Sequence, residues 1–341
     1  MSQFNFRPYR RRFKPPLQTN HGVWDVRDGI IIRLTSNSNV GYGEIAPISW
    51  FGSETVEQAL DFCRQLPKEI SEEIIFSIPD RFPACQFGFE SAWENMLGKQ
   101  LSSQQLKVKN QKSNFSDSRL PTPDSRVFYS ALLPAGKAAL STWQSLAQDD
   151  YSTFKWKIGV YPLAEELAVF HHLIEVLPER VKLRLDANGG LSYEEANLWL
   201  YNCDNIMAAG TGVEIEYLEQ PLAIENLTEM QELSYYYGTA IALDESVANL
   251  TQLETCYQQG WRGIFTIKPS IAGSPSRLRK FCQEHKIDAV FSSVFETIVG
   301  RQAALKLAAE LSINRRAVGF GVHHWLEENE QTWLEQLWQA C

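Results

Sequence analysis

The sequence contains no uninterrupted apolar stretch near the roughly 20 residues that a membrane-spanning helix needs. Its beginning, MSQFNFRPYRRRF, has charged residues where a secretion signal has an apolar core. The formal net charge is −9 and there is no basic tail, which argues against nucleic acid as a partner. We therefore expect a cytoplasmic protein that binds neither a membrane nor nucleic acid.

Closely spaced cysteine pairs are also missing. No CxxC pair occurs among the six cysteines, which are Cys63, Cys85, Cys203, Cys256, Cys282 and Cys341. Zinc and redox motifs need cysteines that lie close in the sequence, so buried free thiols in a reducing cytoplasm are expected instead. The composition, 44% hydrophobic and 21% charged over 341 residues, is typical of a globular protein with one large or two coupled domains.

One compositional break divides the chain. The segment Leu101–Ser125 is polar, rich in Ser, Gln, Asn and Pro, and predicts a linker or surface loop. Before it, a strand-like run at Gly29–Leu34 is followed by helix-like runs at Glu54–Gln65 and Phe87–Leu97. These patterns predict a small α+β domain over residues 1–120.

After the break, short β-prone runs recur at a regular interval of 23 to 32 residues. They begin at Val127, Thr153, Val181, Val213, Ala240, Gly263, Asp288 and Ala317. Helix-length stretches such as Leu163–Leu177 and Tyr193–Cys203 lie between them. About eight strand-then-helix units predict an α/β fold of the (β/α)8 barrel type over residues 126–320. An open, doubly wound sheet would give the same alternation, but the GxGxxG motif typical of many such sheets is absent.

Three of these runs end in a carboxylate. Asp186, Glu219 and Asp244 are separated by 33 and 25 residues, about one strand–helix unit each. A single acidic residue at a strand end is often only a helix N-cap, but three in succession would repel one another unless a cation lay between them. Oxygen ligands in this number suit Mg²⁺, for which Mn²⁺ is a possible substitute.

Lysines lie on either side of the predicted metal site. Lys155 and Lys157 are two residues apart on one strand and so point to the same face, where each lowers the pKa of the other. Lys268 ends the run that begins at Gly263, across the mouth of the barrel. A cation flanked by lysines can polarise a carboxylate while one lysine removes the adjacent proton. The sequence therefore predicts a small-molecule carboxylate substrate.

The ordered set of a KxK pair, three carboxylates and a later lysine resembles the enolase superfamily in its muconate-lactonising subgroup, a known pattern of metal and lysine base. The resemblance implies an enolase-like (β/α)7β barrel whose mouth is covered by an α+β capping domain, residues 1–120 completed by residues 321–341. The segment Gly41–Thr55 is similar to the capping-domain segment of that subgroup. The segment Ile267–Ser274, IKPSIAGS, is similar to the o-succinylbenzoate synthases.

This resemblance implies a reaction. Water would be lost from 2-succinyl-6-hydroxy-2,4-cyclohexadiene-1-carboxylate to give o-succinylbenzoate, a precursor of menaquinone or phylloquinone. Lys157 would be the base, Lys155 would lower its pKa, and Lys268 would stabilise the anion from the opposite face. Arg184 and Asn188 are candidates to support the metal ligands.

Further candidates follow from position alone. Ser292 and Ser293 are candidates to bind the succinyl carboxylate, although loop serines more often cap helices, and His323 and His324 are better explained as a helix cap or core residues. Three alternatives stay open, one of which is another enzyme of the muconate-lactonising subgroup. An N-succinylamino acid racemase would use Lys157 and Lys268 as bases on opposite faces. A non-catalytic barrel would have no reason to keep all six chemical positions. The sequence does not indicate an oligomeric state.

Overall fold

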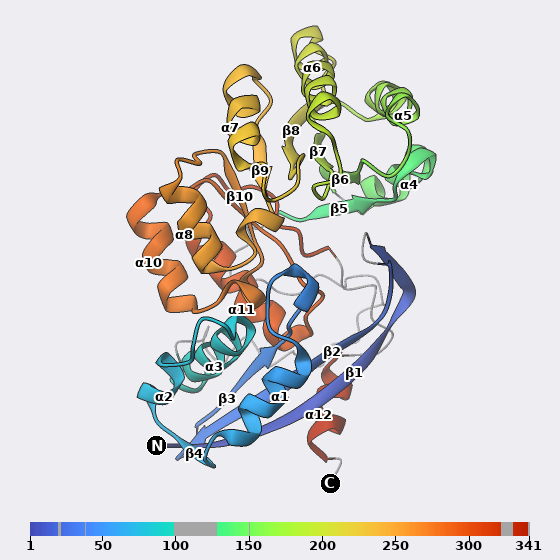
Figure 1. Cartoon of the computed structure of the whole chain (residues 1–341). Coiled ribbons are helices and arrows are strands. Elements are labelled where there is room, and N and C mark those ends of the chain that lie inside the picture. The colour runs from blue at the N-terminus through green and yellow to red at the C-terminus, as the bar shows by residue number, and fades with distance from the viewer. Residues whose placement is uncertain (20–21, 38, 99–127, 150, 322–329, 340–341) are drawn as a thin grey trace.

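The structure is a computed structural model that describes residues 1–19, 22–37, 39–98, 128–149, 151–321 and 330–339 (Figure 1). The predicted linker Leu101–Ser125 and the residues His323 and His324 lie outside the described residues. The chain forms an antiparallel sheet with helices at its N-terminal end and a parallel barrel after it. The fold class predicted from the sequence is confirmed.

The N-terminal part is a four-stranded antiparallel sheet in the order β3-β2-β1-β4. Its strands are β1 (Ser2–Thr19), β2 (Gly22–Ser36), β3 (Asn39–Ile45) and β4 (Glu69–Ile70), and its helices are α1 (Val56–Gln65), α2 (Glu72–Phe76) and α3 (Pro83–Met96). Alternate residues of β2, among them Ile30, Ile32 and Leu34, pack with Phe89 and Ala92 of α3 in one buried cluster.

Glycine lets α3 lie very close to β3. A Cβ atom added at Gly43 would stand 2.0 Å from the carbonyl oxygen of Gly88, and one added at Gly41 would stand 2.1 Å from that of Ala92. No other residue fits at such a contact. This close packing fixes the strand that carries the predicted capping-domain motif.

The barrel has seven parallel strands in the order β11-β10-β9-β8-β7-β6-β5. They are β5 (Ser130–Leu133), β6 (Thr153–Lys157), β7 (Lys182–Asp186), β8 (Glu214–Glu219), β9 (Ile241–Leu243), β10 (Ile264–Ile267) and β11 (Ala289–Phe291). The helices between and after them are α4 (Ala139–Gln148), α5 (Leu163–Val176), α6 (Tyr193–Ala209), α7 (Leu227–Tyr236), α8 (Leu250–Gln258), α9 (Pro269–Ala272), α10 (Pro275–His285) and α11 (Ile298–Leu311).

The run predicted at Ala317 closes the barrel without forming a named strand. Val318 bridges to Tyr129 beside β5, and Gly319 bridges to Ser292 beside β11. The backbone N–H of Ser130 donates to Val318 O at 2.9 Å, and the N–H of Gly319 donates to Phe291 O at 2.8 Å. The eighth predicted run therefore joins the two edges of the sheet through isolated bridges, as in a (β/α)7β barrel.

Alternation along the strands separates the two faces of the barrel wall. On β6, Phe154 and Trp156 are fully buried under the outer helices, and the Trp156 ring packs edge-on against Trp199 of α6. Lys155 and Lys157 take the opposite face. A small second cluster of Tyr217, Ala242, Ile264 and Val290 fills the barrel interior.

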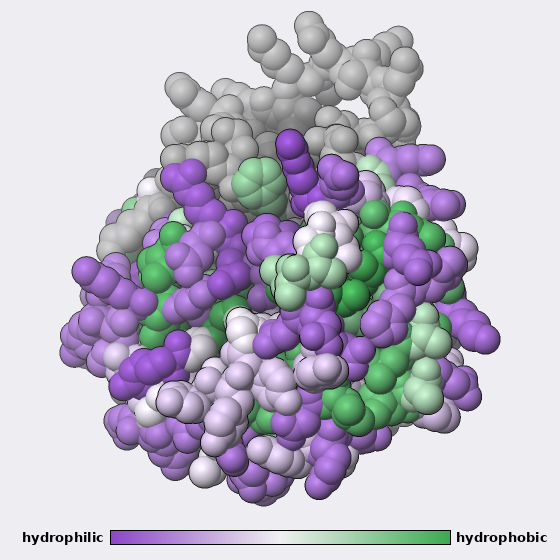
Figure 2. Space-filling view, turned by 90° about the horizontal axis from the view of Figure 1, so that it is seen from above, coloured by the Kyte–Doolittle hydropathy of each residue, from purple (hydrophilic) through white to green (hydrophobic). Residues whose placement is uncertain are grey.

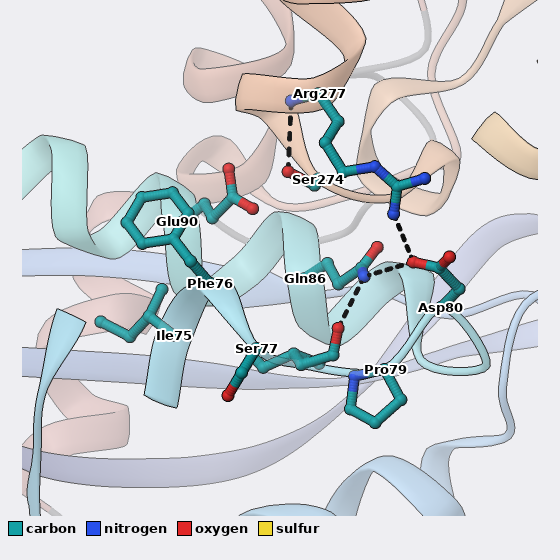
Figure 3. Close-up of a pocket in the computed structure, with 10 residues that line it drawn as sticks. Ile75, Phe76, Ser77, Pro79, Asp80, Gln86, Glu90, Ser274 and Arg277 are labelled. Carbon is teal, nitrogen blue, oxygen red and sulfur yellow. Dashed lines mark hydrogen bonds and ion pairs between the residues drawn. The ribbon is translucent and has the colours of Figure 1, made fainter. Parts of the chain in front are cut away.

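The capping sheet and the barrel share packing and polar contacts. Ile271 of α9 and Val294 after β11 belong to the hydrophobic cluster of the N-terminal sheet. Figure 3 shows a pocket of about 270 Å³ on this seam, where Asp80 accepts hydrogen bonds from Gln86 and Arg277. The last described helix, α12 (Glu330–Gln339), lies on β1, where the guanidinium of Arg11 is 4.6 Å from the Trp333 ring centroid. The domain limits at residues 120 and 321 stay a prediction.

Within the described residues, no helix is both long and apolar enough to cross a bilayer. The face in Figure 2 is mainly hydrophilic, with hydrophobic side chains in small groups among the charged ones.

A buried ion-pair cluster stabilises the end of the barrel opposite the strand ends that carry the predicted site. Glu216 of β8 accepts hydrogen bonds from Arg184 at 2.6 Å and Arg316 at 2.8 Å, and Arg316 also pairs with Asp288 at 2.6 Å. Burial alone would raise the pKa of Glu216, but the two guanidinium groups outweigh it and hold this pKa below its usual range.

We expect Glu216→Ala to lower the free energy of unfolding by about 3–5 kcal/mol, because Arg184 would stay buried without its partner. Since the folded pKa of Glu216 lies below the unfolded value of about 4.3, the pair contributes its full stability above that pH and loses it as the pH falls through the folded pKa. Urea unfolding at pH 7 and in acid measures both effects. Glu214→Ala is the control, because Glu214 on the same strand pairs with Lys182 in solvent. Equal losses in the two variants would contradict the prediction.

Candidate active site

The three predicted carboxylates converge at one end of the barrel. Asp186 and Glu219 are the last residues of β7 and β8 and are directly paired in register, and Asp244 follows β9. All three are buried, with 8%, 0% and 2% of their surface exposed. They come from three neighbouring strands, as the sequence spacing predicted.

Two of the predicted lysines lie among these carboxylates. The ammonium of Lys155 is 2.8 Å from Asp186 Oδ2 and 2.9 Å from Glu219 Oε1. Lys268 donates to Asp244 Oδ1. Lys157 lies one layer above Lys155 on the same face of β6 and is paired in register with Asp186. The structure therefore brings all six predicted chemical residues to one site.

The two β6 lysines have opposite electrostatic environments. Burial alone would lower the pKa of Lys155, but Asp186, Glu219 and Asp244 outweigh it and raise this pKa well above its usual range. The pKa of Lys157 is lowered, first by burial and to a smaller extent by the positive charge of Lys155, while Asp186 and Glu245 oppose the shift. Lys157 is thus the lysine suited to act as a base, and burial contributes more to this than the Lys155 charge on which the sequence argument relied.

The three carboxylates are ligands of the type that a hard divalent cation prefers. Burial, together with Asp186 and Asp244, raises the pKa of Glu219 to about 8, and its Oε2 is buried without a hydrogen-bond partner. Within the described residues, no three acidic, histidine or cysteine side chains stand close enough to enclose an ion as they are. Lys155 and Lys268 pair with these carboxylates and place positive charge beside all three acids.

A fourth carboxylate belongs to the site and was not assigned from the sequence. Glu245 follows Asp244, accepts a hydrogen bond from Asn188 Nδ2 at 3.1 Å, and has a second oxygen that is buried without a partner. Burial, then the charges of Asp244 and Asp186, raise its pKa to about 7. The Asn188 backbone N–H also donates to Asp186 Oδ1 at 3.2 Å, so Asn188 lies where the sequence argument placed it. The adjacent acids in Leu243-Asp244-Glu245 indicated that a second carboxylate was available at this strand end, but not that both side chains would lie at the site.

Two predicted supporting residues have other partners. Arg184, expected to support the metal ligands, lies one layer deeper than Asp186, pairs with Glu216 and covers the Tyr217 ring at 5.1 Å. Ser293, a candidate substrate ligand, donates to Glu296 Oε2 at 2.9 Å and accepts from the Phe295 N–H at 2.9 Å. Its hydroxyl therefore stabilises its own loop.

The other serine stays a candidate. Ser292 is half-buried at the end of β11 beside Gly319, on the bridge that closes the barrel. Its role in substrate binding is a prediction.

The capping domain reaches this site through an aromatic residue. Phe51 belongs to the short helix η1 (Ser49–Phe51), and its ring centroid lies 3.8 Å from the Lys268 ammonium. Nothing in the local sequence indicates this contact, since 217 residues separate the two (268 − 51).

Comparison with known proteins agrees with this geometry. Residues 138–336 match the family model described as "Enolase C-terminal domain-like", and residues 15–96 match "MenC, N-terminal domain". An o-succinylbenzoate synthase from Thermosynechococcus vestitus is 37% identical over 345 residues, which covers 99% of this chain and 98% of that protein. The chain belongs to the o-succinylbenzoate synthase family of the enolase superfamily.

Two solved structures are similar to this chain over nearly its whole length. The crystal structure of o-succinylbenzoate synthase from Thermosynechococcus elongatus BP-1, complexed with Mg in the active site, superposes with a TM-score of 0.83 at 35% identity, covering 99% of this chain and 100% of that one. An N-succinyl Arg/Lys racemase from Bacillus cereus has a TM-score of 0.76 at 16% identity, covering 98% of each chain, and shows a shared fold.

Proposed function

We propose that the chain is a magnesium-dependent o-succinylbenzoate synthase, a hydro-lyase that converts 2-succinyl-6-hydroxy-2,4-cyclohexadiene-1-carboxylate to o-succinylbenzoate for menaquinone or phylloquinone synthesis. The observation that carries the proposal is the convergence of Asp186, Glu219 and Asp244 with the three lysines, in a chain that matches a synthase over 99% of its length. The five described cysteines are buried and free, which supports a cytoplasmic enzyme.

Each residue has a distinct task in this reaction. Asp186, Glu219 and Asp244 would hold Mg²⁺, which would supply positive charge beside the substrate carboxylate. Lys157, the lysine whose pKa is lowered, takes that proton on Nζ. The ring becomes aromatic as the hydroxyl departs, and the proton held by Lys157 joins it to form water. Lys155 stays protonated between Asp186 and Glu219 and orients both.

Lys268 supplies fixed positive charge from the other side of the site. We expect Lys268→Ala to lower kcat by roughly 10²–10³-fold, the typical cost of removing one stabiliser of a developing anion, and Lys268→Arg to retain part of the rate. Initial rates with saturating Mg²⁺ test this, with Lys280→Ala on the exposed face of α10 as the control. A Lys268→Ala enzyme as active as the control would remove Lys268 from the mechanism.

An N-succinylamino acid racemase is the second candidate, because Lys157 and Lys268 come from β6 and from the end of β10, on different sides of the carboxylates. The direct test offers purified protein with Mg²⁺ the cyclohexadiene substrate and N-succinyl amino acids in parallel. Dehydration without exchange of the amino acid α-proton in D₂O supports the synthase alone. Exchange without dehydration would overturn the proposal in favour of the racemase.

A further inference from the structure

One carboxylate of the capping sheet has all its hydrogen-bonding capacity used, most of it by the barrel. Glu44 of β3 is fully buried. Its Oε1 accepts from the Thr297 N–H at 2.9 Å and from the Tyr9 hydroxyl at 2.5 Å, and its Oε2 accepts from Thr297 Oγ1 and from the Gly300 N–H at 2.9 Å. A carboxylate accepts about four hydrogen bonds, so none of its lone pairs is left over.

Three of these four donors belong to the start of α11 in the barrel. Free N–H groups and the positive end of the helix dipole favour a carboxylate there. Gly300 leaves the necessary room, since a Cβ at that position would stand 2.9 Å from Glu44 Oε2. A residue of the capping sheet thus caps a barrel helix across more than 250 positions of sequence.

The capped helix follows directly on a strained loop at the barrel mouth. This β11–α11 loop, residues 292–297, begins at Ser292 and contains Phe295, which has φ 60° although it is not glycine. Such a conformation persists only where the surroundings impose it. The Phe295 ring packs edge-on against Phe13 and Trp24 of the capping sheet, at 5.4 and 5.6 Å between centroids.

The same group of aromatic residues extends to Lys268 in the active site. Trp24 also packs edge-on against Trp50 at 5.0 Å, and the next residue, Phe51, covers the Lys268 ammonium. The β11–α11 loop and the η1 segment therefore both contact the aromatic residues of the capping sheet, on which Glu44 makes a buried polar contact with the barrel.

We infer that Glu44 is a positioning residue: by capping α11 from the neighbouring domain, it docks the capping sheet on the barrel and holds the β11–α11 loop and η1 in place over the bound substrate. Glu44 contacts no catalytic residue, so it acts on substrate binding through the loops. The inference rests on the proposed function only for its kinetic readout.

The test is Glu44→Gln, which keeps the shape of the side chain but turns an NH₂ group toward N–H donors. Since the catalytic lysines lie on barrel strands or directly after one, we expect KM to rise roughly tenfold or more, the factor that corresponds to one lost hydrogen bond to a charged group, with a smaller change in kcat. Hydrogen exchange should become faster at the Thr297 and Gly300 amides and in the β11–α11 loop.

Glu54→Gln is a matched control. Glu54 is also a buried carboxylate of the capping domain that accepts two backbone hydrogen bonds at a helix start, from Ala84 at 3.0 Å and Cys85 at 2.8 Å, but both donors belong to α3 of the same domain. It should lose thermal stability as Glu44→Gln does, while keeping its KM and its loop exchange. Equal KM and equal loop exchange in the two variants would reduce Glu44 to a stabilising residue and overturn the inference.

A milder variant covers the case in which Glu44→Gln does not fold. Thr297→Val removes the hydroxyl that donates to Glu44 but keeps the Thr297 backbone N–H donor. It should therefore raise KM and speed up hydrogen exchange in the loop, each by less than Glu44→Gln does. Unchanged values there contradict the inference. If the chain lacked synthase activity, the exchange measurements would still decide whether Glu44 docks the domains, so failure of the proposed function and failure of the inference are distinguishable.

Discussion

Lys157→Ala should lower kcat by about three orders of magnitude, within the 10²–10⁴-fold that a positioned general base contributes. The reason is that burial, and to a smaller extent the Lys155 charge, lowers the pKa of Lys157, which favours the neutral amine that a base requires. Lys155 cannot replace it, because Asp186 and Glu219 hold Lys155 in its protonated form. Single-turnover rates under saturating Mg²⁺ measure the chemical step directly.

The control for this variant is Lys182→Ala. Lys182 begins β7 at the opposite end of the barrel, where it pairs with Glu214 in solvent. It should keep wild-type rates. Circular dichroism and Mg²⁺ affinity should be unchanged in both variants, so that the loss in Lys157→Ala reports on chemistry alone. A Lys157→Ala enzyme with near wild-type dehydration would end the assignment of this lysine as the base.

Asp244→Ala should abolish both Mg²⁺ binding and activity while leaving the fold intact. Substituting residues that only orient metal ligands already costs about 10–100-fold in affinity, so removing a ligand should cost more. The fold should survive because Asp244 follows the end of β9, and the hydrophobic clusters on both sides of the barrel wall do not include it. Isothermal titration with Mg²⁺ gives the affinity without reference to turnover.

Asp288→Ala separates this effect from the general loss of a carboxylate. Asp288 precedes β11 at the other end of the barrel and pairs with Arg316. It should lose stability and keep its Mg²⁺ affinity. The metal site would have to lie elsewhere if Asp244→Ala bound Mg²⁺ as the wild type does, or if the wild type kept full activity in excess chelator.

The residues at the strand ends were predictable because the signals that place them are local. Alternation along β6 puts Lys155 and Lys157 on the face opposite Trp156. The repeat of strand and helix brings the carboxyl ends of the strands to one rim, and this rim is where Asp186, Glu219 and Asp244 converge. Neither prediction depends on which residues from other parts of the chain pack against these side chains.

Contacts between distant segments were not predictable in this way. Arg184 shares a face with Asp186, as expected, but no local pattern indicated that Glu216, itself paired with Arg316, would hold it in the layer below. Ser293 was a candidate to bind the substrate, but its hydroxyl donates a hydrogen bond to Glu296, three residues later. Which polar group a side chain meets is decided by the three-dimensional neighbours, and these can come from anywhere in the chain.

The family, the barrel and the placement of six candidate catalytic residues were predictable from the sequence, because periodicity and strand-end positions follow from backbone geometry. Three features required the three-dimensional structure: the lowering of the Lys157 pKa by burial, the place of Glu245 in the site, and the contacts of Phe51 and Glu44 between the capping domain and the barrel. The physical reason is that desolvation and domain docking depend on close contacts between residues far apart in sequence. A local pattern does not encode such contacts.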